Sequence, residues 1–146
     1  SVARIENAPV VDTAGVDRLK AAFEKAIAFT ADKRVPGLRL KSPRITIGTL
    51  VIKPAKATST NPGALYVNDT SAEDDYLGKI VGGKFIASRA CTDAQRAKVL
   101  EFVAAPKAAA EAYGQETGTC CICNTELTSK WRLRGIGPVC VKKFGW

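Results

Sequence analysis

The stretch 118–146 contains four of the five cysteines and constrains the fold more than any other part of the chain. Cys120 and Cys123 stand in C-x2-C spacing, which lets a tight turn aim two thiolates at one metal ion. Cys140 follows after sixteen intervening residues and supplies a third thiolate. Because the chain has no histidine, a Cys2His2 site is excluded, and the sequence predicts zinc held by sulfur ligands.

The residues around these cysteines predict a treble-clef-like zinc knuckle. The segment 125–133 is long enough for a short hairpin whose apolar side chains cover the metal, namely Leu127, Trp131 and Leu133. Gly137 and Pro138 then favour the start of a helix. Cys140 would stand in its first turn, where backbone N–H groups favour a thiolate.

The fourth ligand is not evident from the spacing. A treble-clef site usually has a second C-x-x-C at this helix, but its first position here is Gly137. Cys91 and Cys121 are the candidate fourth ligands, and a water molecule or a carboxylate is the alternative. Cys121 directly follows Cys120, and adjacent cysteines seldom bind one ion, so Cys91 is the preferred interpretation. The alternative to a metal site is that all of these cysteines are metal-free, either as reduced thiols or as disulfides.

Two longer motifs surround the cysteines. The sequence reads Y-G-x-x-T-G-x-C-x-x-C-x-x-x-L-T from Tyr113 and G-I-G-P-V-C-x-x-K-F-G from Gly135. Both motifs resemble a domain-of-unknown-function family that recurs in bacteriophage and plasmid proteins, and the similarity spans roughly 64–145. It implies a small phage-type protein with a cysteine knuckle and no settled activity. Asn124 replaces the family's usual glycine, which the turn tolerates because asparagine adopts left-handed backbone, and Arg132 replaces an expected serine.

The length of 146 residues and an apolar fraction of 46% are enough for one domain with a real core. We expect an α+β core over 1–117 with the zinc knuckle, 118–146, docked on it. No apolar run approaches a membrane span, and no charged-then-apolar leader begins the sequence. The sequence therefore predicts a cytoplasmic protein of a bacterial host, with no membrane partner.

Apolar spacing predicts the secondary structure of the core. Residues 16–31 form an amphipathic helix, with Asp12 or Thr13 as its cap. Strands are expected over 45–53 with a bulge at Gly48, over 64–67, and over 76–80 and 84–87 around a Gly-Gly turn. Thr92 and Gln95 form a capping box for a second helix, and Pro106 opens a third, which Gly114 ends. These elements predict a small antiparallel sheet with flanking helices.

The net charge of +8 is unevenly distributed. Residues 1–60 carry eleven basic and five acidic side chains, and 119–146 carry five basic and one acidic. Such basic segments favour an acidic partner, with nucleic acid (DNA or RNA) first and an acidic host or phage protein second. The basic segments are 33–44 and 130–143, and the predicted nucleic-acid-binding residues are Lys33, Arg34, Arg39, Lys41, Arg44, Lys130, Trp131, Arg132, Arg134, Lys142 and Lys143.

Several catalytic systems are missing from the sequence. Without histidine, Ser-His-Asp and Cys-His nucleophiles are excluded, and the chain has neither a P-loop nor a G-x-G-x-x-G motif. We therefore expect a protein that acts by binding and is not an enzyme. Trp131 has two interpretations, a base-stacking contact between Lys130 and Arg132 or a lid over the zinc, and the lid is preferred.

Overall fold

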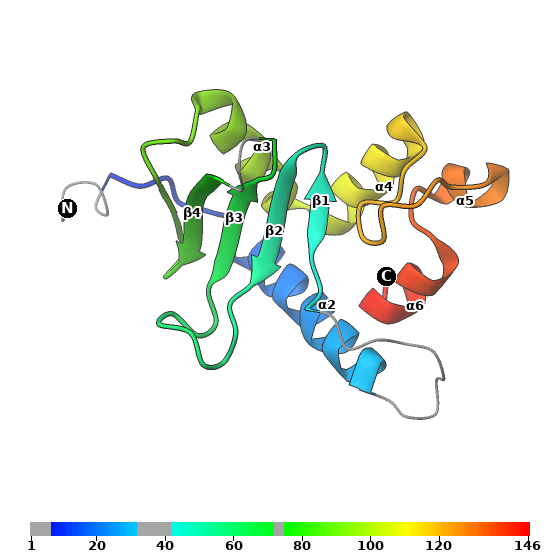
Figure 1. Cartoon of the computed structure of the whole chain (residues 1–146), viewed down its shortest axis with the longest axis horizontal. Helices are drawn as coiled ribbons and strands as arrows, with labels where there is room; N and C mark the ends of the chain where they lie inside the picture. Colours follow the sequence, from blue (N-terminus) through cyan, green and yellow to red (C-terminus); the bar gives the residue numbers. More distant parts are fainter. Residues whose placement is uncertain (1–6, 32–41, 72–74) are drawn as a thin grey trace.

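The computed structural model of this chain describes residues 7–31, 42–71 and 75–146. Within these ranges, five strands form one antiparallel sheet in the order β1-β2-β3-β4-β5 (Figure 1). The strands are β1 (Ile45–Ile47), β2 (Leu50–Pro54), β3 (Leu65–Asp69), β4 (Asp75–Val81) and β5 (Lys84–Ala87). The helices are α2 (Thr13–Ala31), α3 (Asp93–Ala104), α4 (Pro106–Thr117), α5 (Ser129–Arg134) and α6 (Pro138–Phe144). The architecture is α+β, as the sequence predicts.

Two tight turns set the sheet register. Gly82 and Gly83 both have positive φ, 60° and 75°, and join β4 to β5, which confirms the predicted hairpin. The expected bulge at Gly48 is wrong, because Gly48, with φ 61°, makes a second turn that divides 45–53 into β1 and β2. Ile47 pairs with Leu50 on either side of this turn.

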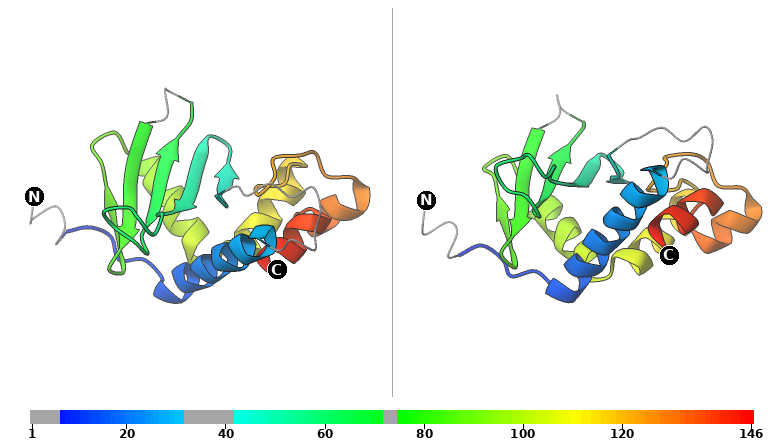
Figure 2. Two further views of the ribbon diagram at one scale, coloured as in Figure 1. Left: turned by 60° about the horizontal axis from the view of Figure 1, so that its bottom comes forward. Right: turned by 90° about the horizontal axis from the view of Figure 1, so that it is seen from below.

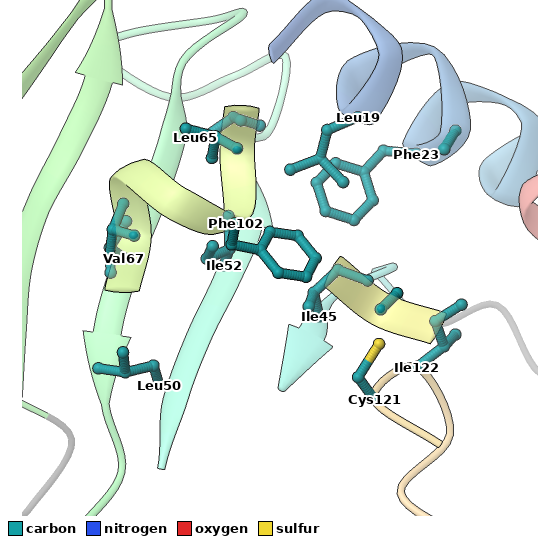
Figure 3. Packing of buried hydrophobic residues seen from close by; sticks show 14 of the residues in the cluster. Leu19, Phe23, Ile45, Leu50, Ile52, Leu65, Val67, Phe102, Cys121 and Ile122 are labelled. Carbon is teal, nitrogen blue, oxygen red and sulfur yellow. The ribbon is translucent and has the colours of Figure 1, made fainter. Parts of the chain in front are cut away.

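Helices α2 and α3 lie against one face of the sheet, whereas α5 and α6 lie beyond its β1 side (Figure 2). Leu19 and Phe23 of α2 and Phe102 of α3 pack with Ile52 and Leu65 of the sheet, and each of these side chains is almost fully buried (Figure 3). Burying one such side chain contributes about 1.5–3 kcal/mol. This apolar layer fixes the helices that carry the C-terminal segment.

Helix α4 ends later than the sequence predicts. It continues through Gly114 to Thr117, and Gly118 ends it in the left-handed region with φ 75°. Gly114 instead marks a close approach, since a Cβ added there would overlap the carbonyl oxygen of Gly135. The helix and the turn before α6 are therefore in backbone contact.

The C-terminal segment packs on the rest of the chain through apolar and backbone contacts. The Phe23 ring of α2 meets the Phe144 ring of α6 edge to face, with centroids 5.8 Å apart. The Thr46 amide of β1 donates to the Cys121 carbonyl at 2.7 Å. Ile122 and Ile136 belong to the same cluster of buried residues as Phe23. None of the helices in the described ranges has both the length and the apolar character that crossing a bilayer requires.

Candidate metal centre

A tight loop presents the first two thiols. The Cys120 amide donates to the Thr125 carbonyl at 3.0 Å, and the Asn124 amide donates back to the Cys120 carbonyl at 2.8 Å. Asn124 has φ 59°, so the turn uses the left-handed conformation that its side chain tolerates. Thr119 and Glu126 form an isolated antiparallel bridge at the base of the loop. This geometry turns Cys120 and Cys123 toward the same point.

Helix α6 brings the third thiol to that point. Pro138 begins the helix, and Cys140 is its third residue. The Sγ atoms of Cys120, Cys123 and Cys140 all lie within 4.8 Å of one another. A tetrahedral zinc site with Zn–S bonds of about 2.3 Å separates its sulfur atoms by about 3.8 Å. The three thiols are therefore arranged as a single metal ion would need them.

Helix α5 occupies the place where a hairpin was expected. Residues Ser129–Arg134 are helical, and Gly135, with φ 86°, ends the helix. Trp131 is half-buried against the core cluster. Leu133, which was expected to cover the metal, is 81% exposed. Of the three side chains expected to cover the metal, Leu127 is therefore buried, Trp131 is half-buried and Leu133 faces solvent.

The other two cysteines lie outside this cluster. Cys121 points into the core beside Ile45 and Ile122, and burial raises the pKa of its thiol to about 12 (Figure 3). Cys91 stands directly before α3, on the side of the molecule away from α5 and α6 (Figure 1). Its thiol is buried, contacts the Thr92 carbonyl at 3.6 Å, and has a raised pKa because of that burial. The structure therefore does not bring Cys91, the preferred fourth ligand, to the three thiols.

Hydrogen bonds among the three thiols shift the pKa values of Cys123 and Cys140 in opposite directions. Donation from Cys120 first, then from Cys140 and Thr125, holds the pKa of the Cys123 thiol far below its usual range. Hydrogen bonds with Cys120 and Cys123, together with burial, raise the pKa of Cys140. The Thr125 hydroxyl lies 2.9 Å from the Cys123 sulfur, a contact that the sequence analysis missed. A hydroxyl two residues after the second knuckle cysteine is the signal that could have indicated it.

A groove opens beside the thiols. We call it the knuckle groove; its volume is about 1130 Å³, and it is lined by 42–44, 122–128, Trp131, 137–140 and Lys143. Of the predicted nucleic-acid-binding residues in the described ranges, the groove brings together Arg44, Trp131 and Lys143. These three come from the approach to β1, from α5 and from α6.

The remaining predicted contacts lie elsewhere. The guanidinium of Arg132 donates to the Glu116 carbonyl at 3.5 Å, and that of Arg134 donates to the Trp146 carbonyl at 2.8 Å. Lys130 places its Nζ 5.5 Å from the centre of the Trp131 ring, and Lys142 is exposed on α6. Lys33, Arg34, Arg39 and Lys41 lie outside the described residues.

Comparison with known proteins gives one result for the C-terminal segment. Residues 110–145 match the model of a family of unknown function, DUF6011. The match covers the part of α4 from residue 110 onward, the thiol cluster, and all of α5 and α6, which is about a quarter of the chain. Neither the curated proteins nor the solved structures contain a significant match to this chain.

Proposed function

We propose that the chain binds one zinc ion through Cys120, Cys123 and Cys140. The support is the convergence of three thiols from two separate elements within 4.8 Å. Thiolate ligands select soft or borderline metals, and a tetrahedral sulfur site is typical of zinc. All five cysteines are free, which fits a reducing compartment such as the cytoplasm of a bacterial host.

We expect the purified protein to retain about one zinc per chain after dialysis. Elemental analysis of single Cys→Ser variants then tests the ligand set. Replacing Cys120, Cys123 or Cys140 should remove most of the zinc, because each removes one sulfur donor. Cys91→Ser and Cys121→Ser are the matched controls and should retain it. Wild-type protein with less than about a tenth of an equivalent would contradict the proposal.

We further propose that the protein binds nucleic acid in the knuckle groove. The observation that carries this proposal is that the groove combines an aromatic ring, Trp131, with two cations, Arg44 and Lys143. Single-stranded nucleic acid is bound by this combination, since bases stack on aromatic rings while cations neutralise phosphates. Ser42, which lines one end of the groove, directly follows the basic stretch 33–41 in the sequence.

Salt dependence provides the test of the nucleic-acid proposal. We expect the affinity for a mixed-sequence single strand to fall steeply with salt, because each neutralised phosphate releases counterions. Arg44→Glu and Lys143→Glu should each reduce the slope of log K against log salt by about 0.7 or more. Lys98→Glu, on the exposed surface of α3, is the charge-matched control and should leave the slope unchanged.

Trp131→Ala separates the two interpretations of this residue in the same assay. A stacking contact predicts a loss of about 1–3 kcal/mol of binding free energy with zinc content unchanged. A lid over the metal predicts lost zinc and lower thermal stability instead. Absence of binding to any single- or double-stranded oligonucleotide at low salt would show that the nucleic-acid proposal is wrong.

An acidic host or phage protein is the second candidate partner. Leu133 on α5 and Val139 on α6 are 81% and 54% exposed, and exposed apolar side chains near cations suit a protein interface. Binding through such a patch would depend weakly on salt. We propose no catalytic role, because the sequence has no histidine and no recognisable base for a nucleophile.

A further inference from the structure

The thiol cluster supplies three of the four ligands that a tetrahedral metal requires. Among the described residues, no carboxylate and no further thiol joins Cys120, Cys123 and Cys140. Glu126 is the one carboxylate of the knuckle groove, and it lies outside the cluster. Structural zinc sites have four protein ligands, whereas sites with three protein ligands leave one position for a ligand from solvent.

Gly137 stands where a fourth thiolate would normally come from. It precedes Cys140 by three residues, which is the spacing of a second C-x-x-C. A Cβ added at Gly137 would lie 3.9 Å from the sulfur of Cys120 and 3.9 Å from that of Cys123. With φ −67°, the backbone at this position accepts any side chain. The position is therefore adjacent to the metal cluster, and the glycine contributes no side chain to it.

The side of the cluster next to Gly137 faces the knuckle groove. Gly137, Cys123 and Cys140 all line it, together with the apolar side chains of Ile122, Leu127 and Val139. A volume of about 1130 Å³ slightly exceeds the range for small-molecule sites, which is roughly 300–1,000 Å³, so a small ligand has room to enter. A small ligand can therefore reach the metal directly from solvent.

We propose that the metal bound by this cluster keeps its fourth coordination position for an exchangeable nitrogen or sulfur donor of a small molecule, which enters through the knuckle groove. This inference rests on the metal binding proposed above. Zinc with three thiolates carries a net charge of −1, and Arg44 and Lys143 of the groove offset it. The site therefore suits a neutral donor or a singly charged thiolate.

Cobalt substitution tests the proposal, because Co²⁺ has visible absorption that reports its ligands and follows zinc in tetrahedral sulfur sites. The probes are imidazole and 2-mercaptoethanol, added to the Co²⁺-loaded full chain. We expect a saturable shift of the visible bands with at least one probe. With the thiol, the sulfur-to-cobalt absorption should rise by about a third, because a fourth thiolate joins three.

Gly137→Cys provides the matched variant. Its Co²⁺ form should have the absorption of four thiolates before any probe is added, and it should no longer respond to either probe. Gly137→Ala adds the Cβ without the thiol, so it should respond as the wild type does. A Gly137→Cys variant that binds cobalt and still responds as the wild type does would overturn the proposal.

The wild-type titration gives a result even if the cysteine variant does not fold. Wild-type protein that binds Co²⁺ and responds to neither probe would show that the chain supplies the fourth ligand, which overturns this inference and leaves the metal site intact. Wild-type protein that binds neither Co²⁺ nor Zn²⁺ would instead overturn the metal proposal itself.

Discussion

At Gly114, the absence of a side chain decides how closely α4 approaches the turn that leads into α6. A Cβ there would overlap backbone atoms of Gly135, and neither segment can relieve such an overlap by a side-chain movement. Gly135 has the reciprocal constraint, since its own Cβ would overlap the backbone of Glu111. The two glycines thus allow the backbone of α4 to lie in direct contact with the segment that leads to Cys140.

Replacing Gly114 tests this contact at a single residue. Gly→Ala inside a helix normally stabilises it by about 1 kcal/mol. At Gly114 we expect the opposite sign, a loss of about 1–3 kcal/mol, because the added methyl group forces the backbones apart. Chemical denaturation measures the change. Ala112→Gly, at an exposed position of the same helix, is the control and should lose about 1 kcal/mol from helix propensity alone. A more stable Gly114→Ala protein would contradict the close contact.

Some site residues could be predicted from the sequence, and others could not. The spacing of Cys120, Cys123 and Cys140 identifies the three thiols that the structure brings together. The left-handed turn at Asn124 also follows from its side chain, and φ 59° confirms it. The structure does not bring Cys91 to the three thiols, and the number of residues between Cys91 and Cys120 could not indicate how far apart they lie in the fold.

At the scale of elements, a carboxylate ties β3 to α3. Asp69, the last residue of β3, accepts hydrogen bonds from the amide of Ser71 at 2.8 Å and from its hydroxyl at 2.7 Å. It also accepts one from the side-chain amide of Gln95 at 2.6 Å. Gln95 belongs to the capping box with Thr92, so the end of the central strand and the start of α3 share one network. The Ser71 hydrogen bonds hold the pKa of the Asp69 carboxyl below its ordinary value.

This lowered pKa predicts a pH-dependent contribution to stability. The contribution is fully present above the unfolded pKa, about 3.9, and is lost as the pH falls through the lower folded pKa. We therefore expect the wild type to be more stable than Asp69→Asn at pH 6 and the difference to shrink below pH 4. Thermal melts followed by circular dichroism from pH 6 to pH 3 measure it.

The helices and turns of the core were largely predictable, whereas the element inside the knuckle was not. The capping box at Thr92 is present as expected, since a local hydrogen-bond pattern defines it. The segment 125–133 is long enough for the expected hairpin, yet 129–134 folds as α5. Segment length alone could not decide between a hairpin and a helix, and Leu133, which was expected to cover the metal, is exposed.

At the scale of the whole molecule, one apolar cluster includes both the sheet core and the cysteine-rich C-terminal segment. Phe23, Ile45 and Phe102 of the core belong to it together with Cys120, Ile136 and Phe144 of the C-terminal segment. The sequence predicted the α+β class and the docking of a small C-terminal unit. It could not predict the knuckle groove, because residues 42–44 form one wall of it although they are remote in sequence from the lining residues between 122 and 143.

This shared cluster predicts that metal removal destabilises the entire chain. At a free zinc concentration about 1,000 times Kd, binding adds about 4 kcal/mol to the free energy of unfolding. For a chain of this size, that corresponds to a Tm increase on the order of 10 °C. We expect a chelator to lower Tm by this amount in one transition. Tryptophan fluorescence, which reports Trp131 and Trp146 near α6, should change together with the far-ultraviolet circular dichroism of the whole fold.

A single unfolding transition distinguishes this prediction from the case of a knuckle that folds independently. A knuckle that unfolds by itself would give an early fluorescence change at a temperature where the circular dichroism of the sheet and of α2 is unaltered. Cys140→Ser should gain little Tm from added zinc, because it lacks one ligand, while Cys91→Ser should respond to zinc as the wild type does. We expect the two parts to unfold together because Phe144 packs on Phe23 and the Cys121 carbonyl accepts a hydrogen bond from β1. Two separate transitions in the zinc-free wild type would contradict this coupling. Both contacts join the C-terminal segment to the core, so removal of the proposed zinc should weaken them along with the thiol cluster.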